Sequence, residues 1–277
     1  MTKPWSDVWT LAERRGGELH SVSFELLTRG RALAEARGCR LCSVVLGDEI
    51  LASEPEELVA RGADRVYVVE DAALGDFLVE SYAGALLYLI ERYRPEVLIA
   101  AATTQGRTLM PYVSMKAHAG LTADCTGLEI DPETGNLLQT RPAIGGNIMA
   151  TIKTPEARPQ MATVRPKSMR APEPDPGRAG EIVREEPPCE LTGRAERLEF
   201  IPAEDTHALG EADIVVAAGR GIKAADKLAV IEDLAAALDG ALGASRDVID
   251  RGWLSYPHQV GLSGKTVSPR LYVACGI

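Results

Sequence analysis

Two short segments near the C-terminal end of the chain combine glycine with arginine, and one of them adds serine. "GRGI" spans 219–222 after the apolar run "DIVVAA", and "GASR" spans 243–246. Glycine lets a backbone approach a ligand closely, and a helix start beside a guanidinium favours a phosphate group. In an open α/β sheet, ligands bind outside the carboxyl ends of the strands, where both turns are expected. The pair therefore predicts a site for a nucleotide-type ligand.

Simpler explanations of the same residues stay open at this level. "GRGI" lacks the full G-x-G-x-x-G pattern, so a plain strand-to-helix turn explains it equally well. Arg246 has Asp247 and Asp250 close in sequence as partners for a surface ion pair. The later segment "HQVGLSGKTVSP" offers Gln259 and Ser263 in a glycine-rich loop, which is consistent with a binding loop or with a turn.

The remaining chemistry-bearing residues form no recognisable metal site or catalytic set. Cys39 and Cys42 make one C-x-x-C, which cannot complete a tetrahedral zinc site alone, and we expect both to pack in the core. The histidines are scattered, and no Ser/His/Asp order is legible. "TTQGR" at 103–107 would hold an anion at a helix start, or Thr103 would simply cap that helix.

An alternation of strands and helices must position these segments. The apolar runs "LCSVVLG", "RVYVVE" and "EVLIAAAT" predict buried strands, and 24–38 and 77–93 predict helices, the first ended by Gly38. Such alternation predicts a parallel sheet covered by helices on both faces. From Thr126, short alternating segments broken by "DPETGN" and Gly-Gly predict an antiparallel addition to that sheet.

The chain then divides into a larger and a smaller α/β domain. The proline- and charge-rich stretch 171–188 predicts an extended connector, and "RLEFIPA" predicts one more strand. A second αβ unit begins near Ala212, and its last strand is "RLYVACGI". Its helix is expected to place Leu228, Ile231, Leu234 and Leu238 on one face. We expect domains at 1–203 and 204–277, the second with few strands for a doubly wound sheet.

Composition excludes several classes of partner. The net charge of −10 argues against binding to nucleic acid or to an anionic membrane, since both favour an excess of lysine and arginine. The longest apolar runs are far shorter than the roughly 20 residues that span a bilayer, and no secretion signal is visible, so no membrane insertion is expected. Five cysteines, an odd number, fit a reducing cytoplasm better than a disulfide scaffold.

The motifs taken in order resemble one known family. "GRGI", "GASR" and "QVGLSGKTVSPRLYVACGI", preceded by "GLTADCTGLEID" and "TRPAIGGNIMATI", strongly resemble the α subunit of electron transfer flavoprotein. The resemblance implies an electron carrier rather than an enzyme, with one FAD held chiefly by the C-terminal domain. It implies a β subunit that contacts the N-terminal domain, and acyl-CoA or other dehydrogenases as donors, as in fatty acid β-oxidation. The segment 137–170 is more similar to members from anaerobes and nitrogen fixers, in which electrons can be bifurcated between two acceptors.

The family's cofactor contacts transfer to this chain motif by motif. Arg220 and Ser245 resemble FAD ligands, and Arg246 resembles the guanidinium packed by the isoalloxazine ring, where a fixed cation stabilises negative charge on the reduced flavin. Ser263 would place its hydroxyl near the flavin N5, and Leu262 stands where some members have a polar glutamine. The expected cofactor-binding residues are Arg220, Ser245, Arg246, Gln259, Val260, Gly261 and Ser263.

The resemblance also implies further motifs that the sequence does not contain. The chain ends at Ile277, before two family motifs that contribute FAD contacts, so we expect an incomplete, truncated FAD-binding domain. An alternative is a flavin-free remnant that only docks its β subunit. A third hypothesis, independent of the resemblance, is a nucleotide-dependent enzyme, but no acid/base or nucleophile set supports it.

Overall fold

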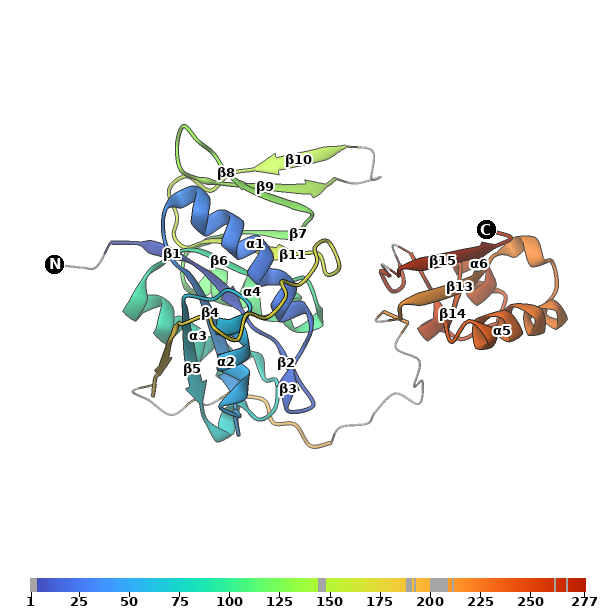
Figure 1. The fold of residues 1–277 in the computed structure, drawn as a ribbon, viewed down its shortest axis with the longest axis horizontal. Helices are drawn as coiled ribbons and strands as arrows, with labels where there is room; N and C mark the ends of the chain where they lie inside the picture. The colour runs from blue at the N-terminus through green and yellow to red at the C-terminus, as the bar shows by residue number, and fades with distance from the viewer. Residues whose placement is uncertain are drawn as a thin grey trace. The chain divides into compact units, whose positions relative to one another are not determined.

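The computed structural model has the alternation of strands and helices expected from the sequence (Figure 1). The described residues are 4–143, 148–187, 191, 193–199, 209–210, 212–261, 263–267 and 269–277. The chain divides into two compact units, unit 1 from Met1 to Leu198 and unit 2 from Glu199 to Ile277. The boundary expected between residues 203 and 204 lies outside the described residues.

Unit 1 is built on a parallel sheet whose strands alternate with helices. Its strands are β1 (Ser6–Leu11), β2 (Arg14–Arg15), β3 (Glu18–Leu19), β4 (Leu41–Gly47), β5 (Arg65–Glu70), β6 (Pro95–Ala101), β7 (Gly120–Cys125), β8 (Gly127–Ile130), β9 (Leu137–Pro142), β10 (Met149–Ile152), β11 (Gln160–Val164) and β12 (Glu181–Arg184). Its helices are α1 (Val22–Arg37), α2 (Ser53–Ala60), the 3₁₀ turn η1 (Ala72–Leu74), α3 (Val79–Tyr93) and α4 (Thr104–Lys116). The large sheet has the order β12-β5-β4-β1-β6-β11-β7, with parallel neighbours throughout. From β1 the chain adds β4 and β5 on one side, and it then returns to add β6 on the other side of β1. The topological switch point therefore lies between β1 and β6.

Helices cover both faces of this sheet, as predicted. Helices α1 and α2 lie on one face, and α3 and α4 lie on the opposite face (Figure 1). Side chains of α1 and α2 pack in one apolar core, and side chains of α3 and α4 pack in another. Successive residues of β4 divide between the two cores, with Val45 in the first and Val44 in the second. This alternation is the period-two pattern of a strand buried on both faces. Gly38 ends α1 with a φ of 63°, which confirms the predicted cap.

The antiparallel addition forms a sheet of its own. Strands β8, β9 and β10 pair in the order β10-β9-β8, with antiparallel neighbours. One part of the expectation was wrong, because β11 belongs to the large sheet and lies between β6 and β7. The side chain of Gln160 links the two sheets, because its Oε1 accepts a hydrogen bond from the Leu137 N–H at 2.8 Å. Short apolar segments show alternation equally in either setting, so the pattern could not assign β11 to its sheet.

The connector expected at 171–188 contains the edge strand β12, so that prediction was wrong in part. Strand β12 pairs with β5 in parallel, and Arg65 forms an ion pair with Glu181 across the two strands. Arg178 anchors the approach to β12, because its guanidinium lies 2.6 Å from the Asp64 carboxylate. An edge strand needs hydrogen-bond partners on one side only, which allows proline and charge around it. The strand expected in "RLEFIPA" falls largely outside the described residues.

Unit 2 is built on a smaller sheet, which is also parallel. It contains β13 (Ile214–Ala218), η2 (Arg220–Ile222), η3 (Ala225–Lys227), α5 (Leu228–Ala237), β14 (Ala241–Ala244), α6 (Arg246–Asp250), η4 (Tyr256–His258) and β15 (Leu271–Cys275). The sheet order is β14-β13-β15, with parallel neighbours. Helix α5 buries Leu228 and Ile231 against Val216, whereas Leu234 is exposed, contrary to the predicted face. Across the described parts of both units, no helix combines the length and the apolar composition that crossing a membrane requires.

Candidate functional site

The three strands of the unit 2 sheet end at one edge, and their following turns contact each other. The N–H of Gly219, after β13, donates to the carbonyl oxygen of Cys275 in β15 at 2.8 Å. The N–H of Gly221 donates to the carbonyl oxygen of Gly276 at 2.8 Å. After β14, the N–H of Ser245 donates to the carbonyl oxygen of Ala218 at 2.9 Å. Hydrogen bonds thus fix the turns after β13, β14 and β15 to one another.

Glycine is required where two of these turns meet. A Cβ atom on Gly219 would clash with the backbone of Gly276, and one on Gly221 would lie 2.8 Å from the Gly276 carbonyl oxygen. Backbone atoms cannot move aside as a flexible side chain can, so larger residues would force the turns apart. The glycines of "GRGI" therefore have a structural function besides any contact with a ligand.

Both arginines of the two motifs lie at this edge and are largely exposed. The side chain of Arg220 is 71% exposed, and its Nη1 lies 3.3 Å from Asp247 Oδ2. The side chain of Arg246 is 70% exposed, and its Nε lies 3.3 Å from Asp250 Oδ2. The ion pair considered for Arg246 from the sequence is thus present, with Asp250. Pairs this exposed hold a guanidinium weakly, so a ligand can take either arginine at little cost.

The third predicted segment folds as a closed loop against β14. The N–H of Val260 donates to the carbonyl oxygen of Ala244 at 2.9 Å, which joins the loop to the end of the strand. The amide Nε2 of Gln259, whose residue is only 4% exposed, donates to Ser263 Oγ at 2.8 Å. Gly261 has a φ of 129° and open space where a Cβ would lie, so its backbone is accessible. The structure thus brings the loop to the edge that carries the two arginines.

All seven predicted cofactor-binding residues therefore belong to one edge of one sheet. Their chemistry suits a flavin dinucleotide, because guanidinium groups bind phosphates and reduced flavin, hydroxyls bind ring heteroatoms, and glycine backbones allow close approach. Their role as FAD ligands stays a prediction. Sequence reasoning missed Asp247 as the partner of Arg220, and it missed Tyr256, whose hydroxyl donates to the Ser263 carbonyl oxygen at 2.9 Å. Only the fold brings these pairs together, so spacing along the chain gave no signal for them.

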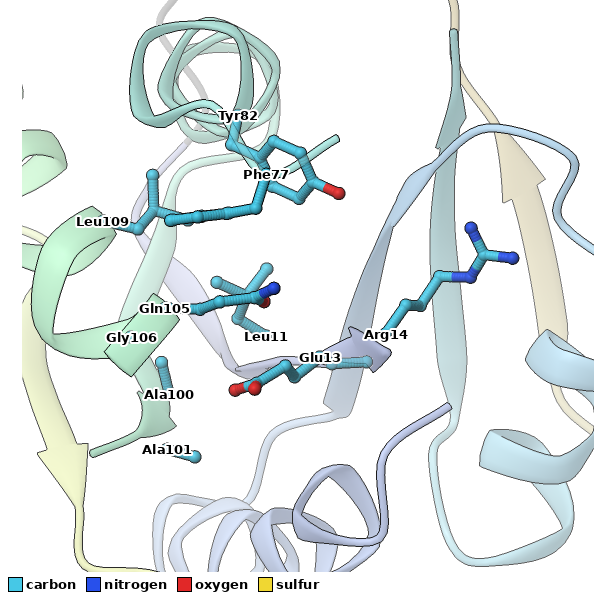
Figure 2. Close-up of a pocket in the computed structure, with 11 residues that line it drawn as sticks. Leu11, Glu13, Arg14, Phe77, Tyr82, Ala100, Ala101, Gln105, Gly106 and Leu109 are labelled. Atoms are coloured by element: carbon cyan, nitrogen blue, oxygen red, sulfur yellow. The ribbon is translucent and has the colours of Figure 1, made fainter. Parts of the chain in front are cut away.

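A second candidate lies at the switch point of unit 1. Figure 2 shows a cavity at the carboxyl ends of β1 and β6, where Phe77 and Tyr82 lie over Leu11 and Gln105. Its volume of about 20 Å³ is room for about one water molecule. In Figure 2 the side chain of Glu13 points toward the start of α4. This cavity is too small for a nucleotide.

The start of α4 is occupied by the chain's own groups. The Thr103 hydroxyl accepts a hydrogen bond from the Gly106 N–H at 3.1 Å, which is the predicted helix cap. The same hydroxyl donates to Glu13 Oε2 at 2.6 Å, so a carboxylate of the protein already lies beside the positive end of the helix. Of the two interpretations of "TTQGR", the structure supports the cap.

The cysteines and histidines add no further site in the described part of the chain. No group of three or more His, Cys, Asp or Glu side chains there is arranged to hold a metal ion. Cys42 is fully buried, and burial raises the pKa of its thiol to about 12. Cys39 is half-buried, and burial also raises the pKa of its thiol. Thiols with raised pKa values are poor nucleophiles, which fits the packing role predicted for this pair.

Comparison with known proteins agrees with this architecture in both units. Residues 8–189 match the electron transfer flavoprotein domain, and residues 208–277 match the electron transfer flavoprotein FAD-binding domain. The chain is 44% identical over 275 residues to the electron transfer flavoprotein subunit alpha of Thermoanaerobacterium thermosaccharolyticum, covering 99% of this chain and 83% of that protein. It is 40% identical over 277 residues to protein FixB of Clostridium saccharobutylicum, covering 99% of this chain and 81% of that protein. It is 43% identical over 282 residues to protein FixB of Azotobacter vinelandii, covering 98% and 76%. The chain therefore belongs to the electron transfer flavoprotein family, among its α subunits.

Proposed function

We propose that this chain binds FAD at the carboxyl edge of the unit 2 sheet and carries electrons on it. As a member of the α-subunit family, the chain is an FAD-based electron carrier rather than a classical enzyme. The observation that carries the assignment of the site is the edge itself. Two exposed guanidinium groups, two serine hydroxyls and accessible glycine backbone lie together there. The proposed ligands are Arg220, Ser245, Arg246, Gln259, Val260, Gly261 and Ser263.

The side chains at this edge have distinct tasks in the proposal. When bound, FAD supplies the one- and two-electron chemistry. Arg246 provides fixed positive charge beside the flavin, which favours its reduction because the reduced ring carries more negative charge. Arg220 binds the phosphate-bearing part, since a guanidinium matches phosphate oxygens in geometry and charge. Ser263 would offer its hydroxyl as a hydrogen-bonding group to the flavin ring.

An α subunit implies a β subunit, and we infer that unit 1 is the part that docks it. Large apolar side chains lie exposed on and beside β10, with Ile148 65%, Met149 53% and Ile152 38% exposed. Grouped exposed apolar residues of this kind are typical of a surface that another protein covers. The electron donor is proposed to be an acyl-CoA or another dehydrogenase. The free thiols of Cys39, Cys42, Cys125 and Cys275 support a reducing, cytoplasmic location.

The test is to co-express this chain with its β subunit and to record the visible spectrum of the purified complex. We expect flavin absorption bands, and we expect FAD, after release from the complex, in stoichiometric amount. A colourless but well-folded heterodimer would contradict FAD binding and would leave only the docking function. A complex that never forms, although both chains are folded, would contradict the proposed function of unit 1.

A further inference from the structure

The hydrogen bond between Gln259 and Ser263 has a direction, and that direction determines what the serine can do. Gln259 Nε2 donates to Ser263 Oγ at 2.8 Å. A serine hydroxyl has one proton to donate and two positions at which it accepts. An amide nitrogen can only donate, so this contact fills an acceptor position and leaves the hydroxyl proton free. Ser263 is exposed, so this proton is available to an acceptor on the open side of the loop.

The groups that hold Gln259 in place are part of the same loop. Its N–H donates to the carbonyl oxygen of Tyr256 at 2.9 Å, and its carbonyl oxygen accepts from the Lys265 N–H at 2.7 Å. A Cβ on Gly264 would clash with the backbone of Gln259, so the loop closes tightly around this residue. With the residue only 4% exposed, little room is left for the Gln259 side chain to bind a cofactor itself.

The backbone of Ser263 is fixed independently of its hydroxyl. The Tyr256 hydroxyl donates to the Ser263 carbonyl oxygen at 2.9 Å. Two side chains therefore act on one serine, with Tyr256 fixing the position of its backbone and Gln259 fixing the orientation of its hydroxyl. A group preset in this way loses little conformational entropy when it forms its next hydrogen bond.

We propose that Gln259 is a positioning residue, whose buried amide orients the Ser263 hydroxyl as a hydrogen-bond donor to the flavin. This inference rests on the proposed function, and it changes the part that Gln259 has there from a direct ligand to one that acts through Ser263. Electron density at the flavin ring rises on reduction, so a donor at this position favours uptake of the first electron. Loss of the donor, or of its orientation, is expected to lower the reduction potential.

The experiment is a double-mutant cycle on the FAD-loaded heterodimer, read by spectroelectrochemistry. The variants are Gln259→Met, which keeps the size but removes the amide, Ser263→Ala, and the two combined. Ser263→Ala should lower the equilibrium constant for the first electron about tenfold, which is ~59 mV for a one-electron couple. Gln259→Met should lower it in the same direction, and it should add nothing in the Ser263→Ala background. Glu232→Gln, on the exposed side of α5, is the control and should leave the potential unchanged.

A second variant keeps the test decisive where Gln259→Met does not fold. Gln259→Glu has nearly the same shape, but its carboxylate accepts the Ser263 proton and so removes the donor. Its charge also acts on the flavin directly, and that part is measured in the Ser263→Ala background and subtracted. The coupling with Ser263 should have the same sign as for Gln259→Met.

The outcomes separate this inference from the function on which it rests. A wild-type heterodimer without flavin would overturn the proposed function and the inference together. A flavin-loaded heterodimer in which Gln259→Met shifts the potential equally in both backgrounds would show direct contact, and would overturn only the positioning role. A Gln259→Met variant with an unchanged potential would overturn it as well.

Discussion

In each unit, the parallel strands end at one edge of that unit's own sheet. The two edges differ in which side chains fill them. At the edge of unit 1, the Glu13 carboxylate accepts a hydrogen bond from Thr103 at the start of α4, and the remaining cavity has a volume of about 20 Å³. At the edge of unit 2, Arg220 and Arg246 are each about 70% exposed. Sheet topology alone would allow a ligand at either edge. The side chains in the turns decide which edge is open, and here that is the edge of unit 2.

The ion pairs at the two edges also differ, in their burial and in their expected contribution to stability. Arg14 and Glu54 in unit 1 have side chains only 8% and 7% exposed, with Nε and Oε2 2.8 Å apart. Arg246 and Asp250 in unit 2 are 70% and 60% exposed, 3.3 Å apart. Removing one partner of a buried ion pair strongly destabilises the folded protein, whereas an exposed ion pair contributes little to its stability. The pair of Arg14 and Glu54 should therefore stabilise the fold of unit 1, whereas the pair of Arg246 and Asp250 leaves Arg246 available to bind a ligand.

The largest expected effect is that of Glu54→Leu, which removes the closest carboxylate from the buried Arg14 cation and leaves it only the more distant Asp48 carboxylate, at 3.9 Å, and backbone carbonyl oxygens. We expect a loss of about 3–5 kcal/mol in the free energy of unfolding of unit 1. Urea denaturation followed by tryptophan fluorescence measures it, since Trp9 is buried in unit 1. The double variant Arg14→Met/Glu54→Leu should recover most of the loss, because it removes both charges. A loss below about 1 kcal/mol for the single variant would contradict the claim that the buried pair in unit 1 contributes more to stability than the exposed pair in unit 2.

Gly219→Ala should have the next largest effect, at the edge of unit 2. The new Cβ would meet the backbone of Gly276, so we expect a loss of about 1–3 kcal/mol in stability and weaker retention of flavin. The matched control is Gly210→Ala, because a Cβ there meets nothing within 4 Å. Denaturation curves and the flavin content of both variants give the comparison. Equal behaviour of the two variants would show that the turns after β13 and β15 can separate freely.

Asp124→Asn tests a partly exposed ion pair in unit 1. Arg165 donates hydrogen bonds to the Asp124 carboxylate at 2.7 and 3.1 Å and holds the pKa of that carboxyl below its usual value. A lowered pKa contributes stability that is present above the unfolded pKa of about 3.9 and is lost as pH falls through the folded pKa. The variant should be less stable by about 1 kcal/mol at pH 7, and the difference should begin to shrink near pH ~4 and vanish once the pH is below the folded pKa of Asp124. Unfolding curves at several pH values check this, and a difference that stays constant with pH would contradict it.

Asp250→Asn should have the smallest effect on stability. The pair with Arg246 is exposed on both sides, so we expect a change within about 0.5 kcal/mol. The same denaturation assay, run beside Glu54→Leu, gives the ratio of the two effects. A cost similar to that of Glu54→Leu would show that Arg246 is held as firmly as Arg14, and it would remove the argument that Arg246 is available to a ligand.

The sequence predicted those elements correctly whose pattern of nearby residues is compatible with only one secondary structure. "LCSVVLG" and "RVYVVE" coincide with β4 and β5, and Gly38 ends α1, because long apolar runs and cap residues act within a few positions. It failed for β11 and β12, because short segments with alternating apolar residues pair with whichever edge the fold presents. Strand assignment of this kind depends on distant partners.

The same division holds at the candidate site. The motifs singled out the glycines, Arg220, Ser245 and Arg246, whose role as ligands stays a prediction. Of the two partners considered for Arg246, Asp247 and Asp250, the structure pairs it with Asp250. The closed end of unit 1 was not predicted, because Glu13 and Thr103 are distant in sequence and meet only across β1 and β6. The direction of the hydrogen bond from Gln259 to Ser263 likewise depends on the shape of the loop.

The most direct test of the account is the affinity of the heterodimer for FAD after removal of one arginine from each edge. Arg246 and Arg107 are matched, since each lies in the first turn of a helix that follows a parallel strand, with side chains 70% and 59% exposed. Titration of flavin-depleted heterodimer with FAD should show binding at least about tenfold weaker for Arg246→Ala. For Arg107→Ala the dissociation constant should stay within about twofold of the wild-type value. Unchanged affinity in Arg246→Ala, or an equal loss in Arg107→Ala, would contradict the claim that the edge of unit 2 is the flavin site.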